Sequence, residues 1–377
     1  MRILSFIIPM VVLISQGFTQ YGWNDQDSES NRFLTAVSFP DAMHGWTVGQ
    51  TNTILNTNNG GEIWIEQIPE PSSNYWSLYF INANVGWACG SNGKIVNTMN
   101  SGVVWLNQTS GTNYDLWDVF FLDELNGWIV GGKPWTTTGP IQMILHTENG
   151  GSTWYFQDYN SGEWPLKAVF FWNEQIGWAV GELGYILTTS NGGENWSYQS
   201  SGTNQQLYDI IFTTATNGWI VGEQGTVLTT SNGGDTWLSV DIGTTHSLQG
   251  IDSFGEQKLW ITGGGLNNGV VFHSFDGGIS WESQYSGISG PFTAISFSDQ
   301  VNGWAVGYNG AIIHTNTGGS DCEPQGDLNM DQIVNILDVI LLVNCIIDND
   351  LCPCADMDQN GDENILDIVL MVNIILS

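Results

Sequence analysis

A repeat of about 41 residues runs through most of the chain and limits what it can fold into. A Gly-Trp-x-x-Gly segment recurs six times, and Leu259-Trp260 is a degenerate seventh copy. Successive tryptophans of the repeat are 41, 41, 50, 41, 41 and 44 residues apart. Each unit contains short apolar strands separated by Gly-containing turns, and its last turn leads into a fourth strand. A period near 41 with four strands per unit predicts an all-β, seven-bladed β-propeller.

The seventh repeat lacks its last strand, because no Trp-x-x-Gln follows Gly319. The missing piece stands at the other end of the chain, where Trp23 and Gln26 lie before the first unit. Trp23 is 41 residues before Trp64, which keeps the register of the repeat. We therefore predict a propeller over 21–319 in which the N-terminal strand 21–27 completes the seventh blade, leaving no open sheet edge at the seam.

The turns of the repeat carry a second pattern, Asn/Asp-Gly-Gly-x-x-Trp, as in 190–196, 231–237 and 274–281. These segments resemble the Asp-box repeats of sialidases, sortilins and related propellers. The Gly-Trp-x-Val-Gly pattern is most similar to that of the seven-bladed photosystem II assembly-factor family. The resemblance covers roughly 21–319 and implies the fold; as an expectation of function it suggests an assembly or stability factor.

The charge balance excludes several kinds of function. Acidic residues number 38 against 6 basic ones, so the surface repels nucleic acids and anionic membranes. A sialidase needs three arginines for the substrate carboxylate, and only Arg32 remains beyond residue 20. The basic patch of the photosystem II relatives is also missing, which puts binding of the same partner in doubt.

One column of the repeat varies while its neighbours stay apolar or small. It lies eleven residues before each repeat tryptophan, on the strand predicted to line the central channel. We expect this column at the channel mouth, with the candidate ligand-binding residues Trp76, Trp117, Lys167, Tyr208 and Gln249. Thr35 and Thr293 complete the column, and free variation of mouth residues without any ligand is the alternative interpretation.

Asp118 and Asp209 stand next to this column and are weak candidates for catalysis. Two carboxylates beside aromatic side chains could cleave a glycosidic bond, as in xyloglucanases. Those enzymes pair two propellers, whereas this chain has one. Capping of turns is the alternative role for both residues.

The C-terminal segment holds two copies of a calcium-loop pattern, 29 residues apart. Ca²⁺ takes six to eight oxygens, and ligands at positions 1, 3, 5, 7, 9 and 12 of a loop wrap around one ion, with position 7 acting through its carbonyl. Gln332 stands at position 6 of the first loop, where the second has Gly361, so the first site is expected to be weaker. The predicted ligands are Asp327, Asn329, Asp331, Ile333, Asn335 and Asp338 in the first loop, and Asp356, Asp358, Asn360, Asp362, Asn364 and Asp367 in the second.

Each loop is followed by an apolar segment typical of a helix, 339–347 and 368–376, and no helix precedes it. A duplicated loop and helix with Asp at position 12 resembles a type I dockerin over 326–377, after a linker at 320–325. The resemblance implies two bound Ca²⁺ ions, calcium-dependent folding and a cohesin-like scaffold partner. It also implies that positions 10 and 11 select the partner, although these apolar pairs could equally pack inside the module; they are Ile336, Leu337, Ile365 and Leu366.

Residues 1–20 are typical of a secretory signal peptide, with Arg2 before an apolar core, so we expect a secreted or cell-surface protein. No later segment is long and apolar enough to span a membrane. Four cysteines gather near the C-terminus, which suggests disulfides of unknown pairing: Cys322, Cys345, Cys352 and Cys354.

Three hypotheses of function follow. The favoured one is a secreted, non-catalytic propeller that binds a protein or glycan and is attached through a dockerin–cohesin contact. The alternatives are a dockerin-borne polysaccharide hydrolase, and an extracytoplasmic assembly factor like the photosystem II relatives.

Overall fold

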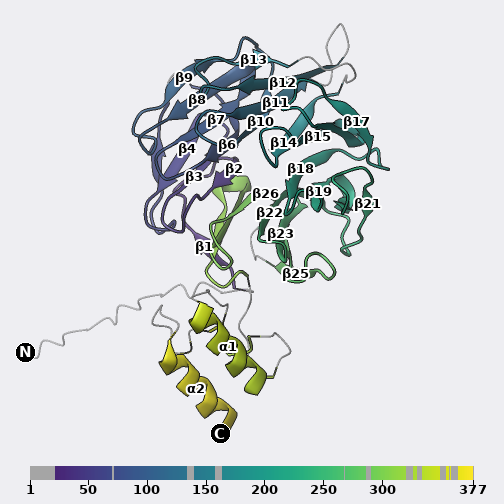
Figure 1. The fold of residues 1–377 in the computed structure, drawn as a ribbon. Helices are drawn as coiled ribbons and strands as arrows, with labels where there is room; N and C mark the ends of the chain where they lie inside the picture. The colour runs from purple at the N-terminus through teal and green to yellow at the C-terminus, as the bar shows by residue number, and fades with distance from the viewer. Residues whose placement is uncertain are drawn as a thin grey trace, which may run out of the picture.

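The computed structural model describes residues 22–69, 72–133, 140–157, 164–266, 268–285, 290–319, 326–328, 333–348, 354–355, 357 and 364–376. Its strands form seven four-stranded antiparallel sheets arranged as blades around a ring (Figure 1). The predicted seven-bladed β-propeller is therefore confirmed. The first strand of each repeat lies innermost, and the last lies at the outer rim.

The blades follow one another along the chain. The first three are β2 (Leu34–Ser38), β3 (Gly45–Gly49), β4 (Thr53–Thr57) and β5 (Ile65–Gln67); β6 (Tyr75–Phe80), β7 (Gly86–Gly90), β8 (Lys94–Thr98) and β9 (Leu106–Thr109); and β10 (Leu116–Phe121), β11 (Gly127–Lys133), β12 (Ile141–Thr147) and β13 (Tyr155–Phe156). The fourth and fifth are β14 (Leu166–Phe171), β15 (Gly177–Gly181), β16 (Tyr185–Thr189) and β17 (Ser197–Ser200); and β18 (Leu207–Phe212), β19 (Gly218–Gly222), β20 (Val227–Thr230) and β21 (Leu238–Ser239). The last two are β22 (Ser247–Phe254), β23 (Lys258–Gly265), β24 (Asn268–Ser274) and β25 (Glu282–Tyr285); and β26 (Phe292–Phe297), β27 (Gly303–Gly307), β28 (Ile312–Thr315) and β1 (Asn24–Gln26).

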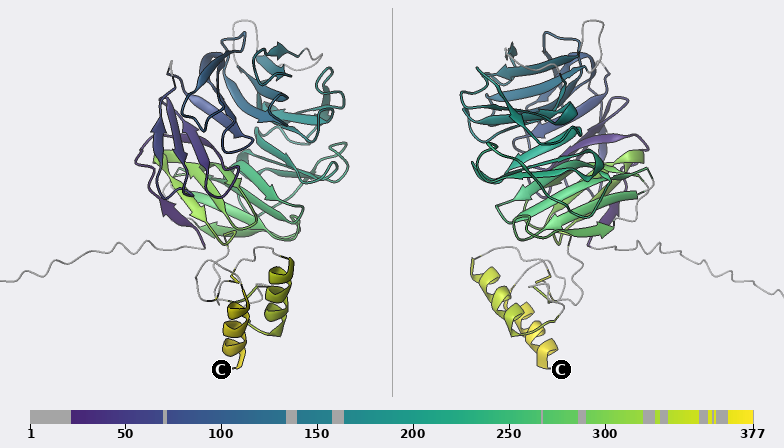
Figure 2. Two further views of the ribbon diagram at one scale, coloured as in Figure 1. Left: turned by 60° about the vertical axis from the view of Figure 1, so that its left-hand side comes forward. Right: turned by 90° about the vertical axis from the view of Figure 1, so that its right-hand side faces the viewer.

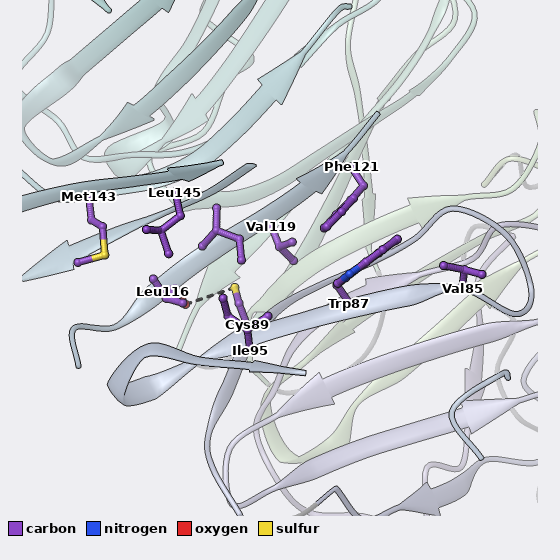
Figure 3. Close-up of a cluster of buried hydrophobic side chains, with 10 residues drawn as sticks. Val85, Trp87, Cys89, Ile95, Leu116, Val119, Phe121, Met143 and Leu145 are labelled. Carbon is purple, nitrogen blue, oxygen red and sulfur yellow. Dashed lines mark hydrogen bonds between the residues drawn. The ribbon is translucent and has the colours of Figure 1, made fainter. Parts of the chain in front are cut away.

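The repeat tryptophan holds neighbouring blades together by stacking on a phenylalanine of the next innermost strand. Trp87 lies on Phe121 with ring centroids 3.5 Å apart, inside the apolar cluster of Figure 3. The same stack joins Trp304 to Phe39 across the closing seam, also at 3.5 Å. Cys89 is buried in the Figure 3 cluster as a free thiol, which fits a small apolar residue in the place of Val.

The residue before the tryptophan must be a glycine, because a phenylalanine of the same blade leaves no room for a side chain there. Phe121 faces Gly127 across the β10–β11 pair, and a Cβ on Gly127 would lie 2.5 Å from the Phe121 ring. Blade six has Ser253 in place of that phenylalanine, and Ser253 pairs with Leu259. Leu259 stands where the other blades have the glycine, and its side chain is fully buried. The degenerate copy of the repeat therefore differs from the others by a local change, in which Ser253 and Leu259 replace the phenylalanine and the glycine.

A glutamine bridges the outer parts of adjacent blades. The Nε2 of Gln67 donates to the carbonyl of Ser101 at 3.1 Å, and its Oε1 accepts from the indole of Trp105 at 3.0 Å. The N-terminal strand β1 pairs with β28 and repeats this arrangement at the closure. Trp23 donates to Gln284 at 2.6 Å, and Gln26 donates to Gly60 at 2.9 Å. The expected N-terminal strand of blade seven is therefore present in the structure.

Two helices follow the propeller, α1 (Ile336–Asp348) and α2 (Ile365–Leu376). They pack on each other around Val339, Leu342 and Met371, outside the ring of blades (Figure 2). Among the described residues, no helix is long and apolar enough to cross a membrane.

The seam between blades five and six lacks both links within the described residues. Val240 stands where the other blades have the bridging glutamine, and Ser253 replaces the stacked phenylalanine. The buried indole N–H of Trp281 consequently has no acceptor. A buried donor without a partner costs about 1–3 kcal/mol, so this seam lacks stabilisation that the seams with both links have.

We predict that Val240→Gln stabilises the propeller by about 1 kcal/mol, because the new amide would accept from the indole of Trp281. Thermal or urea unfolding of the full chain measures the gain. The reverse change, Gln67→Val, should destabilise by about 1–3 kcal/mol as the matched control. A destabilised Gln67→Val together with an unchanged Val240→Gln would show that the seam does not lack this bond.

Candidate functional site

A β-bulge turns one residue of every innermost strand toward the channel mouth. In β10, Leu116 pairs with Gly131 and Asp118 with Val130, so Trp117 between them has no partner on β11. The backbone comes so close there that a Cβ on Gly131 would lie 2.2 Å from the carbonyl oxygen of Asp115. The last glycine of the repeat therefore makes room for the bulge, which redirects the side chain of Trp117.

The bulged residues are the variable column, and they meet in one hollow of ≈ 200 Å³. The structure thus brings together all five candidate ligand-binding residues and both threonines of the column. Phe33, which the sequence argument missed, joins the lining and lies 4.3 Å from Tyr308 between ring centroids. Phe33 lies just before the aligned strand and outside the variable column, so its aromatic side chain was the one sequence signal that could have marked it as a lining residue. The lining consists of Phe33, Thr35, Trp76, Trp117, Lys167, Tyr208, Gln249 and Thr293.

Aromatic and charged groups share the walls of the hollow. The ring centroids of Trp76 and Trp117 are 5.1 Å apart. The ammonium of Lys167 lies 3.6 Å from the ring centroid of Trp117 and 3.7 Å from a carboxylate oxygen of Glu182. Burial lowers the pKa of Lys167, while the negative charge of Glu182 opposes that shift. Burial raises the pKa of Glu182, and nearby Glu223 adds to the rise.

The opposite wall is polar. The hydroxyl of Tyr208 donates to a carboxylate oxygen of Glu223 at 3.2 Å, and burial together with that charge raises the pKa of Tyr208. The hydroxyls of the two threonines donate to backbone carbonyls of the neighbouring blade instead. Thr293 donates to Leu34 at 2.8 Å, and Thr35 donates to Tyr75 at 2.9 Å, so each ties one blade to the next. The aromatic side chains, Lys167 and Gln249 remain to contact a ligand.

Asp118 and Asp209 do not line this hollow. Asp118 accepts from the backbone N–H groups of Val119 and Val169, both at 2.9 Å, and from the hydroxyl of Ser77 at 2.7 Å. Val169 belongs to the next blade. The innermost strands are sheet edges, so these carboxylates satisfy N–H groups that no strand pairs.

The same link recurs at two further seams. Asp209 accepts from Ile210 at 2.8 Å and from Ile251 of the next blade at 2.9 Å. Asp252, which the sequence argument missed, accepts from Ser253 at 2.8 Å and from Phe297 at 2.6 Å. These aspartates therefore join blades at the channel, rather than capping turns or facing a cleft.

Burial is the main influence on the pKa values of the three channel aspartates. It raises the pKa of Asp118 to about 6, of Asp209 to about 8 and of Asp252 to about 6. Mutual repulsion adds to the rise at Asp209. A raised pKa alone fits a general acid, but both oxygens of Asp209 are engaged with backbone N–H groups of its own and the next blade.

The two predicted calcium loops have matching descriptions at their ends. Asp338 and Asp367, at position 12 of each loop, are fully buried. Asp338 accepts from the backbone N–H groups of Leu328 and Asn335, and Asp367 accepts from those of Met357 and Asn364, all at 2.8 Å. Each buried carboxylate thus ties the two ends of its loop together, which suits a donor set for a hard cation.

The remaining ligands are described only in part. Asp327 is nearly buried, and Ile333 and Asn335 lie in the first loop. Among the described residues, no group of three His, Cys, Asp or Glu could hold a metal ion. Six predicted ligands lie outside the described residues: Asn329, Asp331, Asp356, Asp358, Asn360 and Asp362.

The predicted partner-binding residues lie on the surface. They occupy the first positions of α1 and α2, and the structure leaves them 47–75% exposed rather than packed inside the module: Ile336, Leu337, Ile365 and Leu366. Cys345 and Cys354 are disulfide-bonded, whereas Cys322 and Cys352 lie outside the described residues.

The family model of the photosynthesis system II assembly factor YCF48 matches residues 16–109 and 196–286. Over these segments the propeller is similar to the YCF48 assembly factors. The solved structure of YCF48 bound to a D1 peptide superposes with a TM-score of 0.64 at 20% identity, over 78% of this chain and 97% of that chain. YCF48 from Cyanidioschyzon merolae gives 0.62 at 18% identity, over 78% and 98%.

A glycoside hydrolase also shares the fold. The GH74 enzyme of Niastella koreensis superposes with a TM-score of 0.61 at 12% identity, over 78% of this chain and 53% of that chain. The present chain thus spans about half of that enzyme's length, and a likeness at this identity concerns the fold alone. No curated protein matches the sequence.

We predict that Asp209→Asn flattens the pH dependence of stability. The pKa of Asp209 is 3.8 when unfolded and about 8 when folded, so its contribution is present below pH 3.8 and is lost as the pH rises through 8. The loss amounts to at most about 1.4 kcal/mol per pH unit in that window. Urea unfolding at pH 5, 6, 7 and 8 measures the slope.

Asp235→Asn is the matched control, because Asp235 is an exposed carboxylate of the same blade. Its slope should equal that of the wild type. Asp209→Asn also places an NH₂ group where an oxygen accepted from a backbone N–H, so an overall loss of stability is expected in addition to the flatter slope. Parallel slopes for Asp209→Asn and wild type would contradict the assignment.

Proposed function

We propose that the propeller is an extracytoplasmic assembly or stability factor that binds a segment of a partner protein at the channel mouth. The hollow lined by the seven bulged residues carries this proposal. Its ≈ 200 Å³ is smaller than a typical small-molecule pocket of about 300–1,000 Å³ and suits one or two side chains of a bound segment. The solved YCF48 bound to a D1 peptide supports a protein ligand for propellers of this kind.

A polysaccharide hydrolase is disfavoured by the positions of its candidate carboxylates. Asp118 and Asp209 hold N–H groups of neighbouring blades, and neither lines the hollow beside the tryptophans. A glycan ligand of the mouth remains an outcome of the binding test below.

We further propose that the C-terminal module binds two Ca²⁺ ions and attaches the chain to a cohesin-like scaffold protein. The buried Asp338 and Asp367 support the metal sites, since both carboxylates already gather the ends of their loops. A bound Ca²⁺ would supply the positive charge around which the other loop oxygens converge. The exposed apolar pairs that open α1 and α2 support the partner site. The leader-like residues 1–20 support secretion to the same compartment as the scaffold.

We predict that Trp76→Ala and Trp117→Ala each weaken peptide binding about tenfold or more, because large aromatic anchors dominate such contacts. Peptides selected from a displayed random library by the full chain serve as ligands, and calorimetry gives the affinities. Trp172→Ala is the control, since Trp172 is exposed outside the hollow. Unchanged affinity in both mouth variants would contradict a ligand site at the channel mouth. Selective binding on a glycan array would show that the ligand is a sugar rather than a peptide.

We predict two calcium-binding events per chain in a titration, with a gain of helical circular dichroism. Asp367→Asn should remove one event, because a position-12 carboxylate loses its charge. Asp241→Asn, an exposed aspartate of the propeller, should leave both events intact. The calcium module would be refuted if adding Ca²⁺ to the chelator-treated protein produced no binding heat and no change in helical circular dichroism.

A further inference from the structure

We infer that the channel mouth selects a cationic side chain, arginine or lysine, of the bound segment. This inference rests on the proposed function and names the chemistry that the mouth recognises. It is carried by the unbalanced charge beside the hollow, by the aromatic walls and by the size of the space they enclose.

The rim of the mouth carries more negative than positive charge. Lys167 is the one cation of the lining, and Glu182 already lies 3.7 Å from it. Glu223 receives the hydroxyl of Tyr208 and takes part in no ion pair among the described residues. Glu182 and Glu223 repel each other, which raises the pKa of Glu182. A ligand cation near Glu223 would relieve this repulsion and gain an ion pair away from bulk water.

The aromatic wall already holds one cation of the chain itself. The ammonium of Lys167 sits over Trp117 at 3.6 Å, which is a cation–π distance. Trp76 lies beside Trp117, so it extends the π surface of this wall. An arginine entering from outside can lay its planar head on these rings, as Lys167 does with its ammonium. Lys167 then competes with the ligand, because both are cations at one wall.

The space admits one long side chain rather than a folded surface. Its ≈ 200 Å³ is lined by rings of Phe33, Tyr208 and the two tryptophans. An arginine or lysine can bury its aliphatic stem against these rings while its charged head stays at the polar rim. An acidic side chain would instead bring a third negative charge beside Glu182 and Glu223.

The charge of the whole chain acts in the same direction. A formal net charge of −32 attracts basic segments over distances longer than any contact. Association with a basic segment should therefore slow as salt is added, because salt screens this attraction.

The test uses the full chain and four capped tripeptides that differ only in the central residue of Gly-x-Gly. Arginine is compared with citrulline, its neutral near-isostere, and with norleucine and glutamate. Binding is followed by the indole ¹⁵N–H signals of Trp76 and Trp117, assigned with Trp76→Phe and Trp117→Phe. We expect the arginine tripeptide to bind at least tenfold more tightly than the citrulline one, and the glutamate one not to bind.

Charge variants of the mouth sharpen the result. Glu223→Gln should weaken arginine binding at least fivefold, whereas Glu194→Gln, the same change on an exposed outer turn, should have no effect. Lys167→Met should strengthen arginine binding severalfold by removing the internal competitor. A merely structural role of Lys167 would give the opposite sign.

Equal binding of the arginine and citrulline tripeptides would overturn the inference while leaving a peptide site at the mouth. Tighter binding of the glutamate tripeptide, abolished by Lys167→Met, would overturn it in favour of an anion site. If library peptides bind through Trp76 and Trp117 but the arginine tripeptide moves neither indole signal, the inference fails and the proposed function stands. If the library peptides do not depend on these tryptophans, the proposed function fails first.

Discussion

The stack of a tryptophan on a phenylalanine of the next blade sets the spacing of the ring. Trp87 on Phe121 and Trp304 on Phe39 have the same 3.5 Å separation, although one lies within the chain and the other closes it. Flat rings at van der Waals contact fix both the distance and the tilt between blades. Because the innermost strands are attached to these rings, the stack also fixes how wide the channel is and which residues can meet at its mouth.

Closing the ring leaves one problem that the stacks do not solve. Every innermost strand has a free edge toward the channel, and its N–H groups need acceptors. Asp118, Asp209 and Asp252 answer this with carboxylates that reach from one blade to the next. Their charge is costly in such a place, which is why burial raises the pKa of all three. The acidity that could have signalled catalysis is instead a by-product of joining strand edges.

The repeat period was enough to predict the number of blades and the strand that closes them, because both depend on spacing alone. The variable column was predictable for a related reason: a position that escapes the demands of the core can change from blade to blade. The bulge that exposes it was not, since it depends on a close backbone approach at residues such as Gly131 that resembles any other glycine in the sequence. The role of the aspartates was missed because an acceptor for a neighbouring blade leaves no pattern within its own repeat. The weak seam at Val240 could have been found as the one missing glutamine of a complete outer strand.

In each repeat, one set of residues forms the frame that holds the blades together, and another residue lines the channel mouth. The stacks, glutamine bridges and channel acceptors fix the backbone, and the bulge then presents one side chain per blade whose identity the frame does not constrain. Two of these seven side chains are threonines that still serve the frame, so recognition rests on the arc from Trp76 to Gln249. On that arc the only cation of the lining is already matched by Glu182, whereas Glu223 takes part in no ion pair among the described residues. The ligand that completes such an arc is therefore one that brings its own positive charge.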